Sequence, residues 1–383
     1  MKLCIKKLPC DGSVLYDMRS EAARDYGMIG GAAVYDREAV VASAPKAEKI
    51  VLYCQNGDKS RAEAEYLRAR GVQAFYLDGG YIAWLSAEMK KPFGEEARVK
   101  AEESIRKKFR VPLMGRFVKA IKTYELLKPG DKVAVCISGG KDSMLMAKLF
   151  QELLRYSDFE FGLEFVVMDP GYNAENRAAI QSNAKRLGVP VRIFESDIFQ
   201  SVYGVEKSPC YLCARMRRGY LYSFARSLGC NKIALGHHYD DVIETILMGM
   251  LYGAQIQTMM PKLRSSNFEG MQLIRPMYLI RESDIKAWRD YNGLHFIQCA
   301  CRFTENVAES DDSGMPSKRM EVKALIKQLK KKHPDVEKCI FRSVENVNLD
   351  TVIAYKKNGV RHVFTEDYDD CPAQSDWFSA EKV

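Results

Sequence analysis

The chain has 383 residues, which is enough for two or three domains that each bury a core. Its hydrophobic content of 47% and charged content of 28% are typical of a globular protein. The longest apolar stretch, near 243–256, is too short to span a bilayer, and no secretory leader pattern is present. We therefore expect a cytoplasmic protein without a membrane partner. Its eleven cysteines then favour metal ligands or reactive thiols over disulfides.

Residues 1–90 alternate between short strands and helices, as an α/β domain does. The expected strands cover 14–19, 49–53 and 74–77, with a helix over 61–70. Cys54 directly follows the second strand and begins the loop that leads into the helix. Backbone N–H groups and the helix dipole would favour the thiolate form of a cysteine placed there, as persulfide chemistry requires. An inert cysteine buried in an α/β domain is the alternative.

Three motifs in this region resemble those of a single rhodanese domain: D-x-R at 17–19, C-x-x-G-x-K-S at 54–60, and D-G-G at 78–80 with Trp84. The resemblance implies that Cys54 carries a transferable persulfide. It also implies a cysteine desulfurase or another persulfide donor as a partner. Gln55 and Lys59 stand where the family often has arginines, which leaves the preferred donor open.

Residues 91–128 are expected to form a helical, basic linker, because Pro92 and Gly94 interrupt the preceding pattern and Pro129-Gly130 ends the segment.

Basic residues gather in this linker, beside the expected site, and in a helical extension predicted over 311–350. The three basic clusters cover 106–122, 215–218 and 318–332. A solvated charged face is the ordinary explanation of one such run. Three on one chain favour a folded RNA that is gripped by its phosphates.

A glycine turn follows the apolar strand expected at 133–137 and precedes a predicted helix. It reads S-G-G-K-D-S and consists of Ser138, Gly139, Gly140, Lys141, Asp142 and Ser143. Backbone N–H groups at such a helix N-terminus, together with the lysine, form a cradle for an anion. The turn is not a Walker A loop, because Val135 stands in place of its first glycine and Asp142 follows the lysine. A strand-to-helix turn without a ligand is the alternative.

The same run resembles the pyrophosphate loop of PP-loop ATPases. The resemblance implies that ATP is cleaved to AMP and pyrophosphate and that the substrate is activated by adenylation. Residues 129–310 are accordingly expected to be a doubly wound α/β domain, with further strands at 161–168, 191–194 and 232–235. Since ligands of such sheets bind at the carboxyl ends of strands, Met168, Gly236 and His237 are expected to contact the nucleotide.

Two acidic residues, Asp240 and Asp241, follow the last of these strands, and Glu244 lies one helical turn later. Carboxylates in this arrangement could hold Mg²⁺ on a triphosphate. Alternatively, the two aspartates cap the helix, where acidic residues are favoured in any case. Their combination with the glycine turn favours the magnesium interpretation.

The cysteines include two groups that suit a metal centre. Cys210 and Cys213 begin a predicted helix as C-x-x-C, and Cys299 and Cys301 lie far downstream. Two thiolates three residues apart and a distant third could bind an iron–sulfur cluster with one open iron. Four thiolates would equally make a closed zinc site, and the C-x-x-C alone could be a redox pair.

Longer motifs between 105 and 347 look like those of the tRNA 2-thiocytidine synthetases. The most specific ones occupy 210–222, 232–241, 260–263, 274–276 and 281–285. The resemblance implies a [4Fe-4S] cluster on Cys210, Cys213 and Cys299. The family often has C-x-x-C at the second site where this chain has C-x-C, so the role of Cys301 as a fourth ligand stays open.

These features together predict an ATP-dependent tRNA sulfurtransferase. It would adenylate the C2 oxygen of a pyrimidine, here an anticodon-loop cytidine, and replace that oxygen with sulfur. The residues expected to carry the reaction are Cys54, Lys141, Asp142, Asp240 and Asp241. Another PP-loop tRNA ligase, such as a lysidine synthetase, and a non-catalytic sulfur-relay or RNA-binding protein are the alternatives. A homodimer is also considered, and 351–383 is expected to be an acidic, mobile tail.

Overall fold

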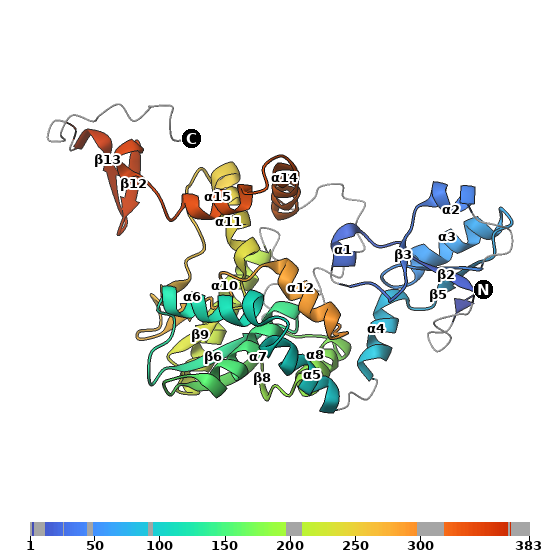
Figure 1. The fold of residues 1–383 in the computed structure, drawn as a ribbon, viewed down its shortest axis with the longest axis horizontal. Helices are drawn as coiled ribbons and strands as arrows, with labels where there is room; N and C mark the ends of the chain where they lie inside the picture. Colours follow the sequence, from blue (N-terminus) through green and yellow to red (C-terminus); the bar gives the residue numbers. More distant parts are fainter. Residues whose placement is uncertain are drawn as a thin grey trace. The chain divides into compact units, whose positions relative to one another are not determined.

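The fold comes from a computed structural model that describes residues 2–3, 12–25, 27–43, 49–90, 95–196, 209–296, 318–366 and 368 (Figure 1). The chain forms two compact units, of which the first contains 1–241 with 260–315 and the second contains 242–259 with 316–383. The rhodanese-like region and most of the PP-loop region expected from the sequence belong to the first unit, whereas 242–259 of the PP-loop region belong to the second. No helix in the described ranges combines the length and the apolar character needed to cross a membrane.

A parallel sheet of five strands occupies the rhodanese-like region, in the order β1-β5-β4-β2-β3. Its strands are β1 (Lys2–Leu3), β2 (Ser13–Asp17), β3 (Ala33–Val34), β4 (Lys49–Tyr53) and β5 (Ala74–Leu77). Its helices are α1 (Glu21–Asp25), α2 (Arg37–Ser43), α3 (Asp58–Arg68) and α4 (Gly80–Lys90). Ile50 and Leu52 of β4 pack into one core cluster with Leu67 of α3, whereas Tyr53 packs into another. Burial on both faces of the sheet explains the continuous apolar run that predicted β4.

A second sheet of six strands has the order β10-β11-β9-β6-β7-β8, and all neighbours are parallel except β10 and β11. Its strands are β6 (Lys132–Ile137), β7 (Gly162–Asp169), β8 (Val191–Glu195), β9 (Lys232–Ala234), β10 (Lys262–Arg264) and β11 (Gln272–Ile274). The helices that follow them include α7 (Lys141–Tyr156), α8 (Ala174–Leu187), α10 (Pro209–Ser227), α11 (Tyr239–Gly253) and α12 (Glu282–Tyr291).

The path of the chain through this sheet confirms the predicted doubly wound α/β fold. The chain runs outward from β6 through β7 to β8 and then returns to β9 on the other side of β6. The strand order therefore reverses between β6 and β9. In doubly wound sheets, ligands bind outside the carboxyl ends of the strands at this point.

Residues 95–123, which we expected to be part of a linker, are helical and pack into the core of the PP-loop domain. The segment forms α5 (Glu95–Arg106), a π-helix (Arg110–Gly115) and α6 (Arg116–Thr123). Its buried apolar side chains recur every fourth residue: Ala101, Ile105, Phe109, Leu113, Phe117 and Ile121. The Phe117 ring meets that of Phe150 in α7 edge-on, with 5.1 Å between centroids. The basic residues that suggested a linker occupy the remaining faces.

A buried charge joins α7 to this segment. Lys148 of α7 is 1% exposed, and burial lowers the pKa of its ammonium group. Its Nζ donates to Glu102 Oε1 on α5 at 2.7 Å and to the Leu187 carbonyl oxygen on α8 at 2.8 Å. A third bond goes to Gln151 Oε1 on α7, also at 2.8 Å. The ammonium group therefore connects three helices.

Among its described residues, the second unit has helices α14 and α15 within the segment expected to be a helical extension, and a hairpin that the sequence did not predict. α14 (Lys318–Lys332) and α15 (Val336–Ser343) precede β12 (Ala354–Lys357) and β13 (Val360–Val363), which pair antiparallel. Asn358 and Gly359 connect the strands with φ of 52° and 83°. The expectation of a mobile tail from 351 onward is therefore wrong for the hairpin. An Asn-Gly pair is the signal of a type I′ turn, and the acidic composition that follows it concealed this signal.

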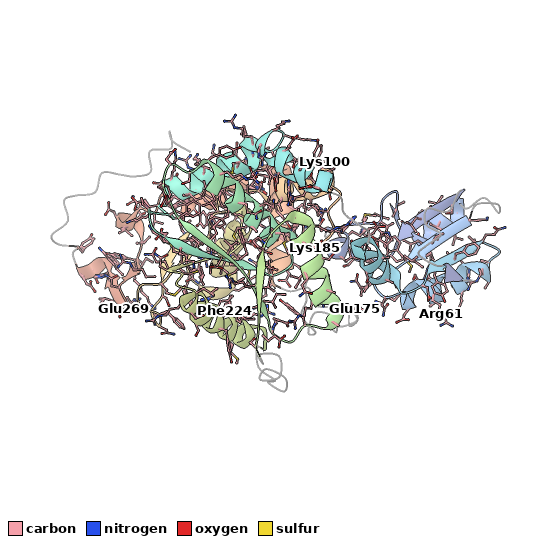
Figure 2. The ribbon with its side chains drawn as sticks, turned by 90° about the horizontal axis from the view of Figure 1, so that it is seen from below. Arg61, Lys100, Glu175, Lys185, Phe224 and Glu269 are labelled. Carbon is pink, nitrogen blue, oxygen red and sulfur yellow. The ribbon has the colours of Figure 1, made fainter. Side chains whose placement is uncertain are left out.

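Lys148→Met is expected to lower the free energy of unfolding by about 3 kcal/mol, because it leaves Glu102 and the Leu187 carbonyl without their buried cation. Urea denaturation followed by circular dichroism measures the loss. The matched control is Lys185→Met. Lys185 is an exposed residue of α8, labelled in Figure 2, and its removal should change stability by less than about 0.5 kcal/mol. Equal stability of the two variants would contradict the packing of α5 into this core.

Candidate active site

The glycine turn lies at the end of β6, beside the point where the strand order reverses. Gly139 adopts a φ of +87°, and α7 begins at Lys141 without a side-chain hydrogen bond from its N-cap residue. Ser143 Oγ accepts a hydrogen bond from Ser138 N at 3.1 Å and donates one to Gly140 O at 3.1 Å. The Ser143 hydroxyl therefore links the two sides of the turn by hydrogen bonds. The result is a strand, a glycine turn and a helix N-terminus in the arrangement that binds anions.

Gly236 follows β9 and packs directly against the first turn of α7. A Cβ atom there would lie 3.3 Å from the carbonyl carbon of Asp142 and 3.3 Å from the amide nitrogen of Ser143. These distances are shorter than ordinary van der Waals contacts, so glycine permits an approach that a larger residue would disturb.

Met168 lies on the other side of β6. The register of β6 and β7 pairs Ile137 with Val167, which brings the next residue, the buried Met168, level with Ser138. Gly236 and Met168 therefore flank the glycine turn from the two strands that neighbour β6. Their contact with a nucleotide stays a prediction.

Lys141 is buried and makes two ion pairs. Its side chain is 4% exposed, and Nζ lies 3.2 Å from Asp142 Oδ2 and 3.2 Å from Glu282 Oε1. The other oxygen of Asp142, Oδ1, is buried and has no hydrogen-bond partner among the described residues. His238 Nε2 lies 3.9 Å from that oxygen. A buried carboxylate oxygen without a donor is costly, so this position suits a cation or a donor group of a ligand.

Asp240 and Asp241 both accept hydrogen bonds within the chain. Asp240 accepts one from Arg281 Nη2 at 3.0 Å and one from Glu282 N at 2.7 Å. Asp241 Oδ2 accepts one from His238 N at 3.0 Å, which is the return bond of a helix capping box. Asp241 therefore caps α11, and magnesium binding by the two aspartates stays a prediction. Across the described ranges, no three His, Cys, Asp or Glu side chains converge on a metal site.

His237 is oriented by a buried arginine that follows β11. Arg275 Nε donates to His237 Nδ1 at 3.3 Å, so Nδ1 is the acceptor of this bond. Burial, together with the neighbouring charge of Arg218, lowers the pKa of Arg275 to about 10. An anionic ligand would stabilise this buried cation at the carboxyl edge of the sheet, because the ligand offsets the free-energy cost of the lost hydration.

The cysteine groups are described only in part. Cys210 and Cys213 lie in the first turn of α10, three residues apart, so their backbone positions fall on one side of that helix. Cys299 and Cys301 lie outside the described residues. The iron–sulfur and zinc alternatives for this set both stay predictions.

Cys54 directly follows β4 and is buried among backbone N–H groups. Its Sγ accepts hydrogen bonds from Gly57 N at 3.2 Å and from Ser60 N at 3.4 Å. Gly80, at the start of α4, has a φ of +59°, and a Cβ there would lie 2.5 Å from the Cys54 carbonyl oxygen. The approach of α4 therefore supports the loop that surrounds the sulfur. Backbone donors in this position stabilise an anionic sulfur.

Comparison with known proteins identifies both domains. A rhodanese-like domain model matches residues 3–87, and a PP-loop domain model matches residues 113–302. The tRNA-cytidine(32) 2-sulfurtransferase of Syntrophotalea carbinolica is 34% identical over 232 residues, which are 60% of this chain and 86% of that protein. The protein of the same name from Pseudomonas putida is 35% identical over 232 residues, 60% of this chain and 81% of its own length. The chain belongs to this sulfurtransferase family.

Membership of the tRNA-cytidine(32) 2-sulfurtransferase family confirms the resemblance seen in the motifs and assigns the chain to a family of enzymes. The two domain models confirm the α/β class of both domains. A solved U34-tRNA thiolase of Methanococcus maripaludis, described with its [4Fe-4S] cluster, is 24% identical to the chain with a TM-score of 0.47. That match covers 60% of this chain and 76% of the thiolase.

Sequence reasoning assigned no role to three residues at the edge of the site: Arg275, Arg281 and Glu282. They lie far downstream of the glycine turn, yet each contacts a residue that the sequence had singled out. The signal was present, since all three belong to the motifs at 274–276 and 281–285. A sequence motif does not show how far its residues lie from another motif in space, however, so only the folded chain reveals these contacts.

Gly236→Ala is expected to weaken ATP binding at least about tenfold, because the added methyl group must displace the backbone at 142–143. Isothermal titration calorimetry with ATP measures the affinity, and urea unfolding checks that the fold is retained. The matched control is Gly219→Ala on α10, where a Cβ would meet nothing within 4 Å. Wild-type affinity in the Gly236 variant would contradict the placement of the nucleotide at this turn.

Proposed function

We propose that the chain is an ATP-dependent tRNA sulfurtransferase that replaces the C2 oxygen of an anticodon-loop cytidine with sulfur. The observation that carries the proposal is the glycine turn at the reversal of the strand order, in a chain of the tRNA-cytidine(32) 2-sulfurtransferase family. A ring carbonyl oxygen is a poor leaving group. Transfer of AMP to that oxygen makes it a good one, and pyrophosphate is released in this step.

The glycine turn binds the phosphates in this proposal. Backbone N–H groups at the start of α7 and the Lys141 ammonium group offset the negative charge that develops during adenylation. Lys141 then exchanges an ion pair with Asp142 or Glu282 for a phosphate oxygen. Mg²⁺ on a nucleotide needs only one or two protein carboxylates, because phosphates and waters complete its shell. The unpartnered Oδ1 of Asp142 supports this residue as one such ligand, with Asp240 or Asp241 as the other.

An iron–sulfur cluster is the cofactor that the cysteine set suits best. Three thiols are the donor set of a [4Fe-4S] cluster that keeps one iron free of protein ligands, and Cys210, Cys213 and Cys299 would hold it. Bound there, the cluster would supply an attachment point for the incoming sulfur. The shared helical turn of Cys210 and Cys213 supports this assignment, since it suits two ligands of one centre.

Transfer RNA is the substrate that the basic surfaces suit. Arg106 is already paired with Glu152 at 2.6 Å, but Lys119 and Lys122 on α6 are exposed. α14 buries apolar side chains on one side, and its lysines cover the exposed faces. Exposed cations of this kind grip RNA phosphates in a salt-dependent way. The target cytidine would be turned out of its loop to reach the nucleotide.

Cys54 is the proposed donor of the sulfur. The backbone N–H groups of Gly57 and Ser60 would stabilise the Cys54 thiolate that accepts the outer sulfur and that is left again when this sulfur departs. A donor within the same chain has a high effective concentration at the acceptor. Conversion of its outer sulfur into the C=S group takes up two electrons, which a thiol reductant supplies. A cysteine desulfurase or another persulfide donor would reload the cysteine.

The test of the main reaction is thiolation of bulk tRNA by anaerobically reconstituted protein with ATP and sulfide. Mass spectrometry of the digested RNA should show 2-thiocytidine, and Lys141→Met should slow its formation at least about 100-fold, because a charge-stabilising group is lost. Lys185→Met should keep the wild-type rate, since that lysine lies on α8, outside the glycine turn and the three basic clusters.

Two outcomes would argue against this function. The absence of a thionucleoside from protein that binds ATP and carries its cluster would refute the sulfurtransferase proposal. A mass change of cytidine that requires lysine instead of sulfide would identify a lysidine synthetase.

The role of Cys54 is tested by changing the sulfur donor. Cys54→Ser should keep full activity with free sulfide and lose at least about tenfold with a persulfide donor plus thiol reductant, because the intramolecular carrier is gone. Cys339→Ser removes an exposed thiol and should behave as wild type with both donors. If the Cys54 variant is equally active with both donors, the sulfur reaches the tRNA by another route.

A further inference from the structure

Helix α12 carries two opposite charges that contact different domains of the first unit. Glu282 begins the helix and Lys286 follows one turn later, with 3.4 Å between Glu282 Oε2 and Lys286 Nζ. Residues four apart lie on the same side of a helix, so these two side chains act on each other. Each of them also has a partner outside α12.

The partner of Glu282 is the lysine of the glycine turn. Glu282 Oε1 lies 3.2 Å from Lys141 Nζ, and the two side chains are 15% and 4% exposed, so little water screens the pair. Lys141 must give up part of this interaction when it binds a phosphate. The strength of the Glu282–Lys141 pair therefore enters the affinity for ATP.

The partner of Lys286 belongs to the rhodanese-like domain. Lys286 Nζ lies 3.2 Å from Oδ2 of Asp25, the last residue of α1, and Arg289 Nη1 donates to the Asp25 carbonyl oxygen at 3.0 Å. The Asp25 side chain is 44% exposed and that of Lys286 is 22% exposed. This outer pair is therefore weaker than the inner one. The charges alternate in sign from Asp25 through Lys286 and Glu282 to Lys141.

We propose that α12 couples the two domains, so that the contact of Asp25 with Lys286 lowers the ATP affinity of the glycine turn. The proposal rests on the proposed function, because it needs ATP at that turn. When Asp25 attracts Lys286, Lys286 neutralises less of the Glu282 charge, and Glu282 holds Lys141 more firmly. When the rhodanese-like domain gives up this contact, Lys286 pairs with Glu282 and Lys141 is released to the phosphates.

This coupling gives the two domains an order of action. ATP binds best while the sulfur-carrier domain is away from α12, and the nucleotide is held less tightly once that domain has docked. Sulfur delivery and the departure of AMP both belong to the docked stage. Lys286 and Glu282 are positioning residues in this scheme, because they act through Lys141 and Asp25 acts through them.

The test is a double-mutant cycle on the ATP affinity of the full chain, measured by calorimetry without tRNA. Asp25→Asn should tighten binding about twofold, and Lys286→Met should weaken it about threefold. The double variant should bind ATP as Lys286→Met does, because Asp25 has no route to Lys141 once Lys286 is gone. Asp25→Asn keeps the backbone carbonyl that Arg289 contacts, and Lys286→Arg should restore wild-type affinity.

Several results would overturn the proposal. If Asp25 acted by its own field or only as a structural contact, Asp25→Asn would change the affinity by the same factor with and without Lys286. Wild-type affinity in both single variants would also refute it. The control is Glu95→Gln, which removes an exposed carboxylate paired with Arg98 and should leave ATP binding unchanged. A wild-type chain that binds no ATP would refute the proposed function itself. If the chain binds ATP but Asp25→Asn changes the affinity by the same factor with and without Lys286, the coupling alone is refuted.

Discussion

The candidate active site depends on the close approach of β9 to the first turn of α7. Gly236 permits this approach. The approach in turn brings His237 and the start of α11 to the turn that follows β6. β6 and β9 are neighbours in the sheet although the chain passes through β7 and β8 between them. Side chains from distant parts of the sequence therefore share one edge. The carboxyl edge of a doubly wound sheet is where such a crossover leaves room for a ligand.

The two domains gather backbone donors in the same way. In each, a buried parallel strand ends in a loop that leads into a helix, and a glycine from another element packs against that loop. Gly80 does so behind Cys54, and Gly236 does so behind the start of α7. N–H groups at a helix N-terminus favour negative charge whether it resides on sulfur or on phosphate. One local geometry thus suits both the donor and the activating nucleotide of the proposed reaction.

Buried cations have two different uses in this chain. Lys148 donates to three acceptors, one on each of three helices, and two of these acceptors are neutral oxygens. It therefore holds those helices together. Lys141 is paired with two carboxylates, Asp142 and Glu282, at the edge of the sheet. A lysine held by charged side chains can exchange one of them for a phosphate without losing its counter-charge. Lys141 is therefore suited to binding a ligand, and Lys148 to stabilising the fold.

Features that depend on neighbours in sequence were readable from the sequence. The apolar run at 49–53 predicted β4, the glycine turn predicted a helix N-terminus, and Cys54 was correctly placed at the end of a strand. The Asn358-Gly359 hairpin was missed although its signal was local, because the acidic residues after it were given more weight. Backbone dihedral preferences and the periodicity of burial reach only a few residues along the chain, and these features need nothing more.

Only the tertiary structure decided which charges meet. The sequence singled out Lys141 and, within a longer motif, Glu282, but it could not show that the two form an ion pair. It gave no indication that Asp25 of one domain lies beside Lys286 of the other. These pairs exist because the crossover from β8 to β9 and the packing of α12 bring distant segments together. Ion pairs depend on distances in space, and those follow from the fold rather than from the spacing of motifs.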